Sequence, residues 1–155
     1  MALAGFSGIA IALSRDRGAL APIDHFRTLN LLMWALGAAF VSIFPLIARS
    51  FGLQGPSIWR ASSAGFLAVL VVCTAVPVNL RRSLAAHDRA LLSRILWVLA
   101  IGGNIVVALA QLSNVLPLFG QSTPGPLLAG LVWLLFFAAL LFVRLLVNRP
   151  VSPAA

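Results

Sequence analysis

The 155-residue sequence contains no lysine, no glutamate and no tyrosine, and its only cysteine is Cys73. A single cysteine cannot form a disulfide within the chain or build a thiolate metal cluster. Charged residues make up 9% and hydrophobic residues 61% of the chain, whereas soluble domains carry about 25% charged residues. The composition therefore excludes an ordinary soluble domain and predicts an integral membrane protein.

Carboxylates are absent from every long apolar run, because Asp16, Asp24 and Asp88 all fall between the runs. Proton- or sodium-coupled transport normally uses an acidic side chain buried in the membrane. Metalloprotease, phosphate-binding-loop and paired-carboxylate motifs are missing as well. We therefore expect a non-enzymatic protein, and predict no catalytic residue, no metal and no cofactor.

Four apolar runs are long enough to cross a hydrocarbon core about 30 Å thick. They cover residues 28–48, 61–80, 95–119 and 127–147. Only helices and closed barrels satisfy their backbone in lipid, and these runs lack the alternation of barrel strands, so they are predicted to be helices. A fifth apolar segment, residues 2–14, is too short to span and predicts a short packed helix, or the end of a longer helix that starts upstream. The predicted fold is a single integral membrane domain, an all-α transmembrane helical bundle of four spanning helices plus a short N-terminal apolar helix.

Arginines mark one side of this predicted bundle. When the connections are taken alternately, Arg15, Arg17, Arg27, Arg81, Arg82, Arg89, Arg94, Arg144 and Arg149 fall on one side, and only Arg49 and Arg60 fall on the other. The positive-inside rule then predicts that the first side, with the C-terminus, is cytoplasmic and faces an anionic leaflet. The net charge of +8 indicates membrane orientation rather than nucleic-acid binding, because no basic groove with interleaved aromatic residues is present.

Three amide side chains, Asn104, Gln111 and Asn114, lie within the third run. Helical steps of about 100° place Gln111 about 20° and Asn114 about 80° from Asn104 around the axis. Isolated amides are costly in lipid, so this side is expected to face other helices or a wet cavity. Two interpretations stay open, namely hydrogen bonding between helices and the lining of a path for a ligand or an ion.

Both histidines, His25 and His87, fall on the arginine-rich side, each beside an aspartate. If their helices were adjacent, the two could ligate a haem or a metal together, oriented by Asp24 and Asp88. The simpler interpretation is that both are solvated residues at the membrane surface.

Several short motifs resemble a group of small bacterial multi-pass inner-membrane proteins. They are AGFSGI near the start, Trp59-Arg60-Ala61 before the second run, and GLVWLLFFAALLFVRLL in the last run. The resemblance implies the fold and a bacterial inner membrane, but no activity. Members of the group begin with a full first helix, and this chain departs from them there.

The leading functional hypothesis is a non-enzymatic membrane protein that acts through helix–helix contacts, as a homo-oligomer or with a membrane-protein partner. Ala61, Gly65 and the side of Asn104 and Gln111 would supply the interface. The alternatives are a pore or carrier for a small uncharged solute, lined by the three amides, and a haem- or lipid-handling membrane protein.

Overall fold

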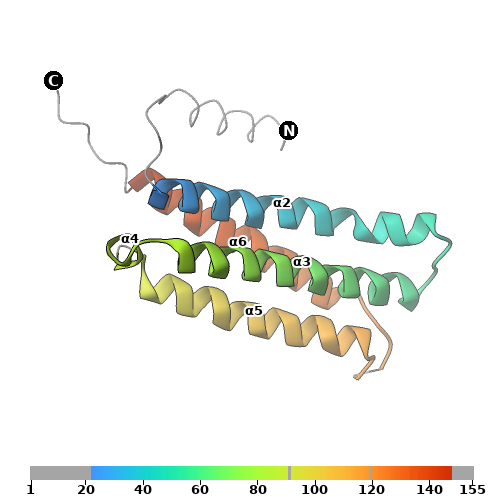
Figure 1. Ribbon diagram of the computed structural model, residues 1–155. Coiled ribbons are helices and arrows are strands. Elements are labelled where there is room, and N and C mark those ends of the chain that lie inside the picture. The colour runs from blue at the N-terminus through green and yellow to red at the C-terminus, as the bar shows by residue number, and fades with distance from the viewer. Residues whose placement is uncertain (1–21, 91, 119, 148–155) are drawn as a thin grey trace.

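The computed structural model describes residues 22–90, 92–118 and 120–147. These residues form the helices α2 (Pro22–Ser50), α3 (Pro56–Ser83), α4 (Ala86–Ala90), α5 (Arg94–Val115) and α6 (Gly125–Val147), and they contain no strand. The four long helices run side by side (Figure 1), and each is long and apolar enough to cross a membrane. The predicted all-α bundle with four spanning helices is therefore confirmed. The short helix predicted for residues 2–14 lies outside the described residues.

The helix ends differ from the ends of the apolar runs. Helix α2 begins at Pro22, ahead of the apolar run that starts at residue 28, since proline suits the first helical turn and the polar residues between them are helical as well. Helix α5 ends at Val115, before the predicted end at about residue 119. The Leu118 N–H returns to the Ser113 carbonyl at 3.1 Å, which closes the helix, and the intervening Pro117 has no N–H with which to extend it.

The long helices form a four-membered ring in the order α2, α3, α5, α6. Helix α2 packs against α3 and α6, and α5 packs against the same two helices from the other side. Helices α3 and α6 also touch across the middle of the bundle. Consequently α2 and α5 lie at opposite corners.

The centre of the bundle is mostly apolar. Its most deeply buried side chains include Val41, Phe66, Leu127 and Leu134. By contrast, Phe40 and Val106 on the outer surface are 58% and 66% exposed, as expected of side chains that face acyl chains rather than water.

Two glycines allow neighbouring helices to approach closely. A Cβ at Gly103 would lie 1.9 Å from Cζ2 of Trp133, and one at Gly65 would lie 2.8 Å from Cδ2 of Phe44. Gly65, which was expected to supply a helix–helix interface, makes room for Phe44 of α2 in its own chain. Ala61, in contrast, is exposed.

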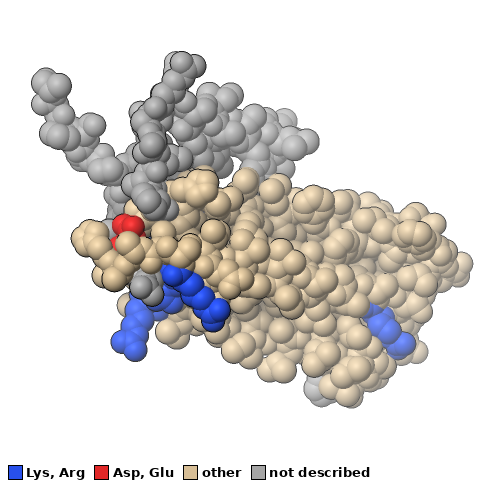
Figure 2. All heavy atoms as spheres, in the orientation of Figure 1, with Lys and Arg blue, Asp and Glu red and all other residues tan. Residues whose placement is uncertain are grey.

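The described arginines lie at the two ends of the bundle. One end, called the arginine-rich end below, carries Arg27, Arg81, Arg82, Arg89, Arg94 and Arg144, and the other carries Arg49 and Arg60. On the face drawn in Figure 2, an uncharged band separates the two groups. Arg15, Arg17 and Arg149, which were predicted to join the larger group, lie outside the described residues.

Candidate functional site

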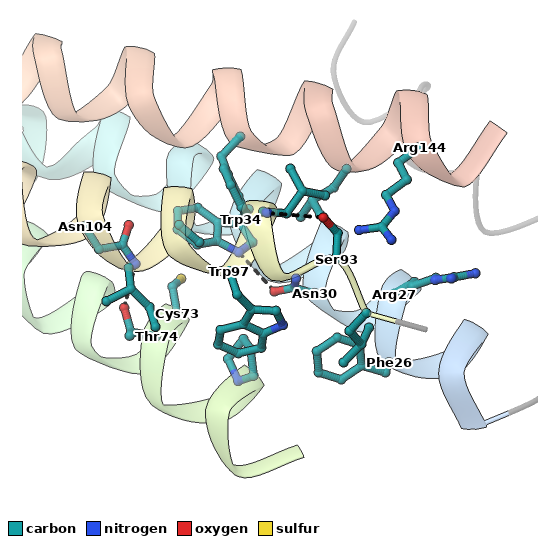
Figure 3. Close-up of a pocket in the computed structure, with 17 residues that line it drawn as sticks. Phe26, Arg27, Asn30, Trp34, Cys73, Thr74, Ser93, Trp97, Asn104 and Arg144 are labelled. Carbon is teal, nitrogen blue, oxygen red and sulfur yellow. Dashed lines mark hydrogen bonds between the residues drawn. The ribbon is translucent and has the colours of Figure 1, made fainter. Parts of the chain in front are cut away.

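A cleft opens inside the bundle at the arginine-rich end, between α2 and α5 (Figure 3). It exists because these two helices occupy opposite corners, and all four long helices contribute to its lining. Its empty space, with the open mouth included, is about 710 Å³. The centres of water molecules can occupy only about 60 Å³ of it, room for roughly four to six waters. The cleft is therefore narrow.

Aromatic side chains form much of the cleft wall. Trp34 of α2 and Phe137 of α6 meet with their ring centroids 4.7 Å apart. On the α5 side the wall is Trp97, and the Arg81 guanidinium carbon lies 4.5 Å from the centroid of its ring. This cation–π contact holds the indole against the C-terminal end of α3.

Two arginines, Arg27 of α2 and Arg144 of α6, line the cleft at one end. Figure 3 shows them at the opposite end of the cleft from Asn104 and Thr74. Each guanidinium carries five N–H donors in a planar fork that matches carboxylate and phosphate groups. The sequence singled out both residues only as markers of topology, so their joint position in a cleft is a new feature.

A hydrogen-bonded group formed by Asn104, Thr74 and Trp133 lies at the other end of the cleft. The Trp133 Nε1–H is a donor only, so the Asn104 atom that accepts it, at 3.0 Å, is the carbonyl oxygen Oδ1. The Asn104 amide Nδ2 then donates to Thr74 Oγ1 at 2.8 Å, and Thr74 donates its hydroxyl hydrogen to the Leu70 carbonyl at 2.7 Å. The group joins α3, α5 and α6 and fixes the orientation of the Asn104 amide.

The other two amides of α5 lie farther toward the opposite end of the bundle. Asn114 donates to Ser63 Oγ at 2.8 Å and to the Thr123 carbonyl at 3.0 Å, and its Oδ1 accepts from the Thr123 N–H at 2.9 Å. Gln111 is fully buried and donates to the Pro126 carbonyl. Asn114 therefore bonds α5 to α3 and to the loop before α6, and Gln111 bonds α5 to the first turn of α6. Only Asn104 of the three amides lines the cleft.

The two histidines lie at the surface. His25 on α2 and His87 on α4 are both exposed. Among the described residues, no group of three or more His, Cys, Asp or Glu side chains is placed to hold a metal ion. Their pairing around a haem stays a prediction from the sequence.

Several residues that line the cleft, notably Asn30, Thr74 and Trp97, were not predicted from the sequence as site residues. A usable signal was present on α2, where Arg27, Asn30 and Trp34 follow one another at helical spacing and so share one side. The structure shows the resulting contact, a 3.0 Å hydrogen bond from Trp34 Nε1 to Asn30 Oδ1.

The chain matches no protein-family model, no curated protein and no solved structure in comparisons with each. Its function is therefore inferred from the site alone.

Proposed function

We propose that the chain is a lipid-handling, non-enzymatic membrane protein that binds a single-chain anionic amphiphile in the cleft between α2 and α5. The observation that carries the proposal is the joining of an apolar, aromatic interior to Arg27 and Arg144 in one narrow space. Guanidinium groups bind carboxylate and phosphate heads through paired, charge-assisted hydrogen bonds. Basic pockets between transmembrane helices on the cytoplasmic side are a known type of lipid head-group site.

The proposed orientation places the arginine-rich end in the cytoplasm, in a bacterial inner membrane as the sequence resemblance implies. The positive-inside rule supports this orientation. With it, the cleft opens at the level of the anionic cytoplasmic leaflet, which would supply the ligand.

A pore for an uncharged solute has less support from the geometry. Beyond Asn104 the bundle interior is filled by Phe66, Gln111 and Leu134, each fully buried. A role through intermolecular contacts of the Asn104–Gln111 side has less support too, because these amides already bond to Thr74 and to the Pro126 carbonyl within the chain.

Cys73 provides an internal reporter of cleft occupancy, because it lines the cleft and is the only cysteine. The experiment uses the full chain in bilayers of zwitterionic phosphatidylcholine and measures the rate at which N-ethylmaleimide alkylates Cys73. We expect myristate to slow this rate in a saturable way, and myristyl alcohol to do so at least tenfold more weakly, because charge-assisted hydrogen bonds contribute about 1.5–3 kcal/mol.

Variants at the two ends of the bundle separate head-group binding from general charge effects. Replacing both Arg27 and Arg144 with glutamine is expected to raise the half-protecting myristate concentration about tenfold or more. The matched control is Arg60→Gln, which removes an exposed arginine at the other end and should leave protection unchanged. Equal protection by the acid and the alcohol, or an equal effect of Arg60→Gln, would contradict the proposal.

A further inference from the structure

The Asn104 amide has one hydrogen-bond donor more than its surroundings use. Its Oδ1 accepts from Trp133 Nε1, and its Nδ2 donates to Thr74 Oγ1. An amide nitrogen carries two hydrogens, and Thr74 Oγ1 is the acceptor that the described residues give it. Asn104 is 6% exposed and lines the cleft, so the second hydrogen is a donor at the end of the cleft away from the arginines.

The orientation of this donor cannot be reversed by turning the amide over. With Oδ1 and Nδ2 exchanged, the Trp133 N–H would face an NH₂ group, and two donors would oppose each other. The Thr74 hydroxyl adds no alternative, because it donates to the Leu70 carbonyl at 2.7 Å. The cleft end therefore offers a donor, not an acceptor, and a ligand that displaces water from this end has to supply an acceptor in its place.

We infer that the amphiphile bound in the cleft carries a second hydrogen-bond acceptor, an ether, ester, keto or hydroxyl oxygen, far along its chain from the anionic head. This inference rests on the proposed function and specifies its ligand class. Trp133, which contacts Asn104, lies roughly 16 Å along α6 from Arg144, at about 1.5 Å per residue. An extended myristate chain is also roughly 16 Å long, because each carbon–carbon bond of about 1.5 Å advances roughly 1.25 Å along the zigzag. The acceptor therefore belongs in the distal half of such a chain.

The test compares ligands of the same chain length that differ only in the position of one ether oxygen. The probes are myristate and a series of oxa-myristates, in each of which an ether oxygen replaces one methylene, and the readout is protection of Cys73 from N-ethylmaleimide. Each value is corrected for partitioning of the probe into protein-free bilayers. We expect one or two adjacent distal positions to bind about three- to tenfold more tightly than myristate, the gain typical of one hydrogen bond, and proximal positions to bind no better.

Two variants assign the preference to the donor. Asn104→Leu should reduce the ratio of the binding affinity of the best analogue to that of myristate to about one. Thr74→Val, which leaves both Nδ2 hydrogens available, should retain this affinity ratio. The positional scan on the unchanged chain remains decisive if Asn104→Leu does not fold. Equal binding of all oxygen positions, or a ratio that survives Asn104→Leu, overturns the inference and leaves the proposed function standing. Absence of protection by every probe, myristate included, removes the proposed function itself.

Discussion

Two adjacent glycines of α5, Gly102 and Gly103, are predicted to respond in opposite directions to the same substitution. A Cβ at Gly103 would lie 1.9 Å from Cζ2 and 2.2 Å from Cη2 of Trp133, whereas a Cβ at Gly102 meets nothing within 4 Å. Gly103→Ala therefore has to displace the Trp133 ring, and with it the 3.0 Å hydrogen bond to Asn104. Gly102→Ala changes only the surface of the helix.

The size of the difference follows from three contributions to the free energy of unfolding. Overpacking a close contact costs about 1–3 kcal/mol, and loss of one hydrogen bond between membrane helices costs about 0.6 kcal/mol. The higher helix propensity of alanine offsets up to about 1 kcal/mol. We expect Gly103→Ala to lower the free energy of unfolding by about 0.6–2.6 kcal/mol, and Gly102→Ala to leave it unchanged or raise it by up to about 1 kcal/mol.

Reversible unfolding in mixed micelles with increasing dodecyl sulfate measures these values, with circular dichroism reporting helix content and tryptophan fluorescence reporting packing. A double-mutant cycle identifies the cause, because Gly103→Ala should lose its cost in a Trp133→Leu background. The reasoning fails if the two glycine variants differ by less than about 0.3 kcal/mol, or if the cost of Gly103→Ala persists without the indole.

Two further predictions concern the end of the bundle away from the cleft and the orientation of the chain. Asn114→Leu removes three side-chain hydrogen bonds, at about 0.6 kcal/mol each, and should lower the free energy of unfolding by about 2 kcal/mol in the same titration. Ser113→Ala removes only a bond within α5, and an equal loss for this control would argue against the assigned role of Asn114. In a Cys73→Ser background, an impermeant maleimide added outside intact cells should label Gln54→Cys but not Ser83→Cys, and the reverse pattern would invert the proposed topology.

The four spanning helices could be predicted because each apolar run is long enough to cross a bilayer by itself. The helix ends were harder to predict, because hydropathy marks where contact with lipid stops and backbone hydrogen bonding continues beyond that point. Helix α2 thus starts at Pro22, ahead of its apolar run. Helix α5 stops at Val115, inside its run, where a hydrogen-bonded turn and Pro117 end it.

The inward position of Asn104 also followed from the sequence, through the cost of an amide in lipid. Its partners did not, because Thr74 and Trp133 belong to other helices and their pairing depends on the order of helices around the ring. The cleft could not be predicted either, because it lies between α2 and α5, which occupy opposite corners of the ring. Arg27 and Arg144, far apart in the chain, line the same end of the cleft because α2 and α6 are neighbours.

The contact between α2 and α6 has a consequence for biosynthesis. At about 5–20 residues per second, the ribosome needs roughly 5–20 s to proceed from the end of α2 at Ser50 to the end of α6 at Val147. During that interval Trp34 lacks Phe137, the ring that covers it in the finished bundle. One side of α2 therefore stays uncovered until α6, the last helix to be synthesised, packs against it.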